Sequence, residues 1–304
     1  MPDIANVTVV CFLASYIVAL VGEFLRITTS IRWMRWLVLL FSCAGFIAHT
    51  AYLIVRSQQH DLPPLVGSAH DWLLVLSWLC MAYYLIRTLR NPNLALGVFL
   101  YPPVILLTLS AYFVSSNPNE LVVQSEIRQW ILLHAAFLVF GILGVLVSFE
   151  SSLMYLYLHY RLKHKRPIPG GLKLPNLEKL ARVNWWSVLV SVPLLTLGMA
   201  SGVILLFYLK KTDAAEELKL TDPVILVNGF VWLVMFLFFI RLLVKPGAKS
   251  RQVAWMTIWA CGFMLLTLLG LQILFGRFHD SMDSFHSGSE QPRSVYALGE
   301  GAAG

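Results

Sequence analysis

Apart from the histidines of the basic loop, of a polar loop and of the tail, four of the eight histidines lie within or beside long apolar runs, where an imidazole is stable only if it is hydrogen-bonded or bound to a ligand. His134 is the clearest case, because no charged residue lies between Arg128 and Glu150 in the stretch RQWILLHAAFLVFGILGVLVSFE. The other three are His49, His70 and His279. These positions indicate either ordinary hydrogen-bonded histidines or a site for a metal or a cofactor.

Three arginines, Arg56, Arg128 and Arg277, each stand within seven residues of one of these histidines. Haem iron is commonly held by neutral imidazoles from separate helices, and guanidinium groups pair well with carboxylates such as the haem propionates. The alternative is that these arginines only extend from helix ends toward the membrane surface. A bare zinc site is disfavoured, since no HxxxH, HxH or HExxH pattern occurs within an apolar run.

The elements that position these residues are predicted to be transmembrane helices. Of the 304 residues, 58% are hydrophobic and only 13% are charged, and the mean hydropathy is +0.72. A soluble domain would be about half apolar and a quarter charged. We therefore predict an all-α, polytopic membrane helix bundle of eight spans. The runs cover residues 4–24, 36–55, 67–87, 94–115, 130–158, 185–208, 223–244 and 253–276.

The distribution of charge predicts the orientation of the bundle. With eight spans, 16 of the 23 Lys and Arg residues fall on one side, which is therefore predicted to be cytoplasmic. Both termini then face outward, and all four apolar-run histidines lie in the outer half of the membrane or at its surface. The same bias accounts for the net charge of +7 without a nucleic-acid partner. The predicted location is the bacterial inner (cytoplasmic) membrane.

The longest cytoplasmic loop, RLKHKRPIPGGLKLPNLEKLARVNWW, is basic and is broken by Pro and Gly. We expect it to contact anionic lipid and to form a short amphipathic helix from Asn176. The chain divides into a membrane segment of four helices (1–128), a second membrane core (129–280) and a polar tail (281–304) that is expected to be disordered. No nucleophile–base pair, phosphate loop or paired carboxylates indicate an enzyme.

The second half resembles the cytochrome c assembly membrane-protein family, the superfamily of the CcsA/ResC and CcmC proteins and their HemX-like and YpjD-like relatives. The resemblance rests on the segment after His134, on LPNLEKLARVNWWSVLVSVPLLTLGMASG and on LTDPVILVNGFVWLVMFLFFIRLL, and it covers about residues 130 to 280. The stretch FYLKKTDAAEELKLTDP lacks the tryptophan-rich motif of the haem-presenting members, and Phe239 replaces a family histidine two residues before Arg241. The chain is therefore most similar to the HemX-like/YpjD-like branch.

The resemblance implies that His134 and His279 are axial ligands of a haem b at the outer face. His49 and His70 would form a secondary pair or donate supporting hydrogen bonds, and Arg56, Arg128 and Arg277 would lie near the propionates. The expected function is haem handling that assists cytochrome c maturation, together with a membrane partner of that machinery. The alternative is a HemX-like regulator of haem biosynthesis that acts through the basic loop 161–182 without a tight haem site.

Overall fold

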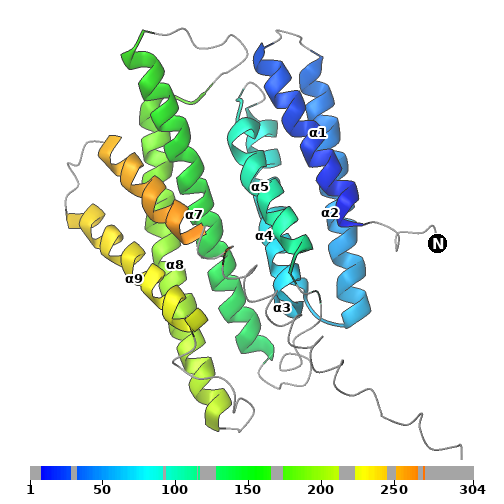
Figure 1. The fold of residues 1–304 in the computed structure, drawn as a ribbon, viewed down its shortest axis with the longest axis vertical. Helices are drawn as coiled ribbons and strands as arrows, with labels where there is room; N and C mark the ends of the chain where they lie inside the picture. Colours follow the sequence, from blue (N-terminus) through cyan, green and yellow to red (C-terminus); the bar gives the residue numbers. More distant parts are fainter. Residues whose placement is uncertain are drawn as a thin grey trace, which may run out of the picture.

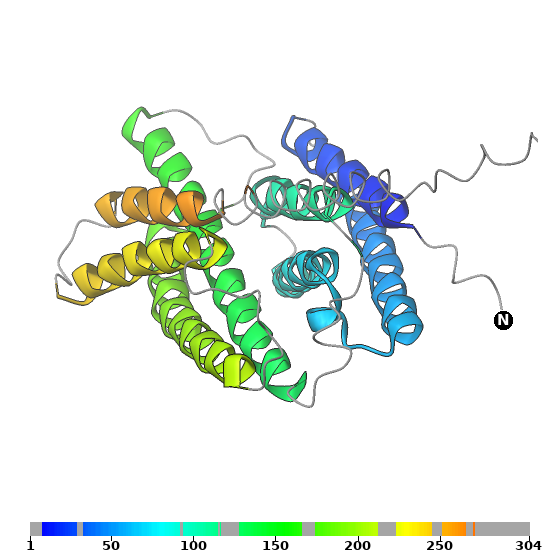
Figure 2. The same cartoon turned by 60° about the horizontal axis from the view of Figure 1, so that its bottom comes forward.

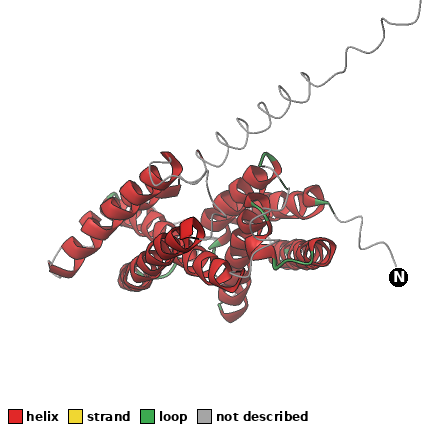
Figure 3. Cartoon of the chain, turned by 90° about the horizontal axis from the view of Figure 1, so that it is seen from below, coloured by secondary structure: helices red, strands yellow, loops and turns green. Residues whose placement is uncertain are grey.

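The computed structural model describes residues 8–28, 33–91, 94–114, 116, 128–165, 174–211, 223–244, 251–265 and 270. Within these residues the protein is helical and contains no strand, as the sequence predicted (Figure 3). The helices are α1 (Val9–Thr28), α2 (Met34–His60), α3 (Pro64–Gly67), α4 (Ala69–Arg90), α5 (Gly97–Tyr112), α7 (Arg128–Lys163), α8 (Leu177–Lys211), α9 (Pro223–Val244) and a further helical segment, 251–265.

Five of these helices are long and apolar enough to cross a membrane, namely α1, α2, α4, α7 and α8. In the described part of the chain, α5 and the Leu226–Leu242 portion of α9 are shorter apolar helices. Each predicted run has a helix at its place, and the bounds of α9 coincide with the run 223–244. The total of eight spans and the outward termini remain predictions.

Helices α7 and α8 are longer than a bilayer requires. They contain 36 and 35 residues, which correspond to about 54 Å and about 52 Å at 1.5 Å per residue, whereas the hydrocarbon core is about 30 Å thick. The predicted run at the place of α7, 130–158, is already longer than the about 20 residues that a span needs. At α8 the prediction of a separate short helix was wrong, because the helix that follows Asn176 continues through Pro193 without a break. The segment LEKLARVNWW contains no Gly or Pro that would end it.

The helices form two groups that lie side by side (Figure 1). One group contains α1, α2, α4 and α5, and the other contains α7, α8, α9 and the segment 251–265 (Figures 1 and 2). The most extensive contacts are between α7 and α8 and between α1 and α2, while α3, α4 and α5 contact α7 only sparsely. α7 is therefore the helix through which the described parts of the two groups meet.

A buried ion pair lies inside the first group. The Glu23 carboxylate is 2.9 Å from the Arg26 guanidinium and accepts a hydrogen bond of 3.0 Å from the Tyr84 hydroxyl. Arg26 also donates to the Leu94 carbonyl at 3.2 Å. A Cβ at Gly97 would lie 2.7 Å from Cγ of Glu23, so this glycine allows α5 to pack against the pair. The contacts connect α1, α4 and the start of α5 at the end of the bundle opposite His70.

Candidate functional site

His134 is held by helix α8 in one orientation. It is the seventh residue of α7, and its Nδ1 lies 2.8 Å from the Gly198 carbonyl oxygen and 3.2 Å from Oγ of Ser201. A carbonyl only accepts hydrogen bonds, so Nδ1 carries the proton. Ser201 donates its own hydroxyl proton to the Gly198 carbonyl at 2.8 Å, which leaves its oxygen to accept from the imidazole. Nε2 of the neutral ring then carries a lone pair, and it has no partner among the described residues.

Glycine residues in α8 make room for this imidazole. A Cβ built on Gly202 would lie only 2.7 Å from Cε1 of His134, and one on Gly198 would lie 2.6 Å from Leu138. The motif GMASG, residues 198–202, therefore has a structural role: it supplies the carbonyl and the hydroxyl that bind Nδ1 and the space that the ring occupies. The spacing of two glycines around a serine was the signal in the sequence for this role.

His134 lies beside the short helix α3. Leu62 and Val66 are buried against Ile131, Leu132 and Ala135 of α7, on both sides of His134 in the sequence. The imidazole itself is partly buried, and Trp130, one turn earlier on the same helix, is 62% exposed. The candidate site therefore lies at the end of the bundle where the α2–α3–α4 corner meets the first turns of α7.

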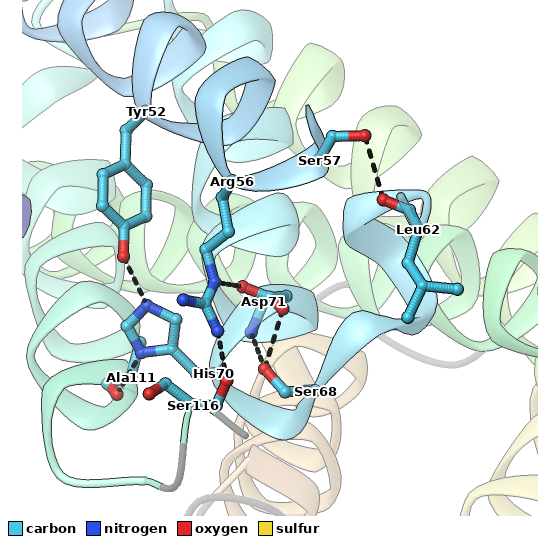
Figure 4. Close-up of polar contacts among 9 residues, drawn as sticks. All are labelled: Tyr52, Arg56, Ser57, Leu62, Ser68, His70, Asp71, Ala111 and Ser116. Atoms are coloured by element: carbon cyan, nitrogen blue, oxygen red, sulfur yellow. Dashed lines mark hydrogen bonds and ion pairs between the residues drawn. The ribbon is translucent and has the colours of Figure 1, made fainter. Parts of the chain in front are cut away.

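His70 makes two hydrogen bonds and has no free ring nitrogen (Figure 4). Nδ1 lies 2.7 Å from the Ala111 carbonyl, so it must be the donor, and Nε2 accepts a hydrogen bond of 3.0 Å from the Tyr52 hydroxyl. The ring is buried. Of the two predicted roles for His70, this geometry favours the supporting hydrogen bonds over coordination of iron.

Arg56 is engaged with other groups of the protein (Figure 4). Its Nε is paired with the buried carboxylate of Asp71, and its second guanidinium nitrogen donates to the Ser116 carbonyl. Asp71 in turn accepts from the hydroxyl of Ser68, which caps α4. The pairing of Arg56 with Asp71 was not predicted from the sequence, although the two residues stand 15 positions apart, on either side of the α3 corner. This pairing leaves Arg56 poorly placed to bind a propionate.

His49 is packed inside the first group, away from the surface. It is fully buried, its ring is stacked on Phe12 with centroids 4.2 Å apart, and its Nδ1 lies 3.1 Å from the Tyr16 hydroxyl. Its Nε2 is buried without a hydrogen-bond partner in the described structure. No contact joins His49 to His134, so these two histidines do not form one site in the described residues.

The remaining predicted ligands are not all described. Arg128 is the first residue of α7 and is partly exposed, six residues from His134. Arg277 and His279 lie outside the described residues, as does the tail 281–304. Among the described residues no group of three His, Cys, Asp or Glu side chains could hold a metal ion. The second axial ligand therefore remains a prediction.

No family model, no curated protein and no solved structure matches this chain. The class of protein that the fold defines is an all-α protein with several helices that could cross a membrane. A more specific assignment depends on the geometry of the site and on the resemblance described above.

Proposed function

We propose that this protein is a membrane haem-handling protein that assists cytochrome c maturation, with His134 as one of its iron ligands. The observation that supports the proposal is the orientation of this imidazole: Nδ1 is bound to the Gly198 carbonyl and Ser201, while Nε2 has no partner among the described residues. Metal-binding histidines commonly donate their other ring nitrogen to a backbone carbonyl, because this fixes both the tautomer and the ring plane.

The rest of the proposed site is supported by the family resemblance and by the sequence alone. His279 is the proposed second ligand of a haem b, which would supply an iron with two axial positions for imidazoles. Arg128 and Arg277 are proposed to lie near the propionates, where guanidinium groups would neutralise their charge. Since Arg56 is paired with Asp71, its proposed part is to hold the α2–α4 corner that packs beside α7. We propose that the haem is passed on with the help of a membrane partner of the cytochrome c maturation machinery.

The test is an absorption spectrum of the full chain purified in detergent and supplied with haem, in oxidised and reduced forms. We expect a Soret band and split visible bands for the native protein, and a loss of most of this signal in His134→Ala and His279→Ala. A His134→Gly variant should regain the signal when free imidazole is added, because the small ligand can take the vacated position.

His164→Ala is the matched control, since His164 is an exposed residue at the other end of α7 whose Nδ1 binds the carbonyl of Tyr160. It should leave the spectrum unchanged. A folded native protein that takes up no haem would contradict the proposal. The alternative function, a HemX-like regulator that acts through the loop 161–182, would then be tested by deleting that loop and measuring cellular haem content.

A further inference from the structure

A cavity of about 570 Å³ opens between α4, α7 and α8, at the end of the bundle opposite His134. Its polar wall comes from Arg87 of α4 and from Asn176, Lys179 and Arg182 at the start of α8. Lys179 and Gly202 are 23 residues apart on α8, or about 35 Å along the helix, so the cavity is separate from the candidate haem site. The haem proposal uses none of the residues that line it.

The cavity has an excess of positive charge. Arg87, Lys179 and Arg182 contribute three cations. Glu178, the one acidic residue among the described residues that line the cavity, pairs with Arg182 at 2.6 Å. Arg87 is near enough to the buried Glu150 of α7 to act on it electrostatically, but the two form no ion pair. The arrangement therefore favours an anionic ligand.

Arg87 has a donor that the protein does not use. Its Nε is buried and has no hydrogen-bond partner in the described structure. Arg87 lines the cavity, so an anionic ligand there would lie beside a guanidinium group whose hydrogen-bonding capacity is not fully used by the described part of the protein. The positive end of the α8 dipole also faces this region, although Asn176 caps the helix there and its Oδ1 accepts a hydrogen bond of 2.9 Å from the Lys179 amide.

The surroundings of the cavity fit the boundary between lipid and water. Apolar side chains of Val147 and Val183 line it beside the cations, and Trp186 at its edge is 57% exposed. Tryptophan is enriched at the level of lipid headgroups. The charge distribution predicts that this end of the bundle faces the cytoplasm, where the anionic lipids of a membrane attract clustered Lys and Arg residues.

We propose that this cavity binds the phosphate headgroup of an anionic phospholipid, with Arg87, Lys179 and Arg182 as its ligands. The cations bind the phosphate, and the apolar wall contacts the glycerol and the start of the acyl chains. The proposal refines the general expectation that the basic loop contacts lipid, because it places the contact at three side chains from two helices. A lipid bound there would also hold α4 against the start of α8.

The experiment compares three probes on the full chain in a neutral detergent: dioctanoyl phosphatidylglycerol, dioctanoyl phosphatidylcholine and inorganic phosphate. Binding is measured by native mass spectrometry and by the rise in melting temperature. We expect phosphatidylglycerol to bind and to stabilise the protein more than the other two probes. Arg87→Gln, Lys179→Gln and Arg182→Gln should each weaken this binding about fivefold, as expected for the loss of one cation near a lipid headgroup.

Arg90→Gln is the matched control, because Arg90 is exposed in the last turn of the same helix and does not line the cavity. It should leave the affinity unchanged, while Glu178→Gln should raise it by removing the carboxylate that competes for Arg182. Lys179 and Arg182 are exposed, so these two variants are expected to fold even if Arg87→Gln does not. Equal binding of both lipids, an equal loss in Arg90→Gln, or stabilisation by phosphate as strong as by phosphatidylglycerol would overturn the proposal.

Discussion

His70 and His134 lie at the same end of the bundle, on either side of α3, and their ring nitrogens are used differently. Both nitrogens of His70 are occupied, by the Ala111 carbonyl and by the Tyr52 hydroxyl. His134 uses only Nδ1. A ligand that approached His70 would have to break the bond to Tyr52, whereas Nε2 of His134 can accept a metal without the loss of any described contact. This difference, more than position in the membrane, favours His134 as the ligand.

At the residue scale, Gly202→Ala tests whether the space that Gly202 leaves for the His134 imidazole is needed for haem binding. The added Cβ would lie 2.7 Å from Cε1 of His134, so the imidazole must move away from the Gly198 carbonyl. Disturbed support of a metal-binding histidine commonly costs about tenfold or more in affinity, and we expect haem to leave the variant at least that much more readily. The measurement is the rate of haem transfer to an excess of an apo-globin.

Gly229→Ala in α9 is the control for this substitution. Nothing lies within 4 Å of a Cβ built at Gly229, so the variant should retain haem as the native protein does. Equal rates of haem loss in the two variants would show that the close contact between Gly202 and the imidazole does not support haem binding.

At the scale of elements, the pair α7–α8 depends on small residues that bring the two helices close together. Gly141 faces Leu195 and Gly144 faces Ser191, each so closely that a Cβ would lie 2.8 Å from a side-chain carbon of the opposite residue. Within a bilayer there is little hydrophobic force between helices, so close packing contributes much of their association. The same closeness places the Gly198 carbonyl within reach of His134, since both contacts lie along one interface.

Gly141→Ala is therefore expected to destabilise this pair. Its Cβ would meet the side chain of Leu195 at 2.8 Å and its backbone nitrogen at 3.2 Å, and the backbone of α8 cannot move locally. Overpacking of this kind costs about 1–3 kcal/mol, which should appear as a lower melting temperature in detergent. Gly262→Ala should have a much smaller effect, because the nearest atom there is Cε2 of Phe149 at 3.6 Å. A melting temperature unchanged by Gly141→Ala would mean that the helices can separate at little cost.

At the scale of the whole molecule, the two candidate sites lie at opposite ends of the helices. The proposed haem site combines the start of α7 with the second half of α8, and the proposed lipid cavity combines the end of α4 with the start of α8. The helices that carry both sites are among the five that could cross a membrane, so the sites would face opposite surfaces. The predicted orientation assigns haem to the outer surface and lipid headgroups to the cytoplasmic one.

This orientation can be tested by placing a cysteine at each end of the bundle, with Gln59→Cys at the end of α2 and Lys163→Cys at the end of α7. Both positions are exposed. A membrane-impermeant maleimide should label Gln59→Cys in intact cells and Lys163→Cys only after the membrane is opened. The parent chain, with its four native cysteines, gives the background. The reverse pattern would move His134 to the cytoplasmic side and would contradict an outward-facing haem site.

Features that depend only on residues close together in the sequence could be predicted from the sequence. Apolar runs, interrupted by charged residues and by Pro or Gly, predicted that the chain is helical. They also gave the bounds of α9 and a start of α7 within two residues of the observed one. This was possible because helix formation and burial in a membrane are local properties. The same reasoning selected His134 as a residue that needs a partner. It placed the start of α8 at Asn176, one residue before the helix begins at Leu177, but it separated that helix from the span that it continues into.

Contacts between helices were decided only by the tertiary structure. Gly198 is 64 residues from His134, and Arg56 and Asp71 belong to different helices that meet at the α3 corner. Arg87 and Lys179 line one cavity because α4 packs near the start of α8. Which side chains face one another depends on how far each helix is rotated and on how closely small residues allow it to approach. The local sequence of a single helix determines neither its rotation nor its distance from its neighbours. The partner of each imidazole and the cationic cavity could therefore be identified only from the packed helices.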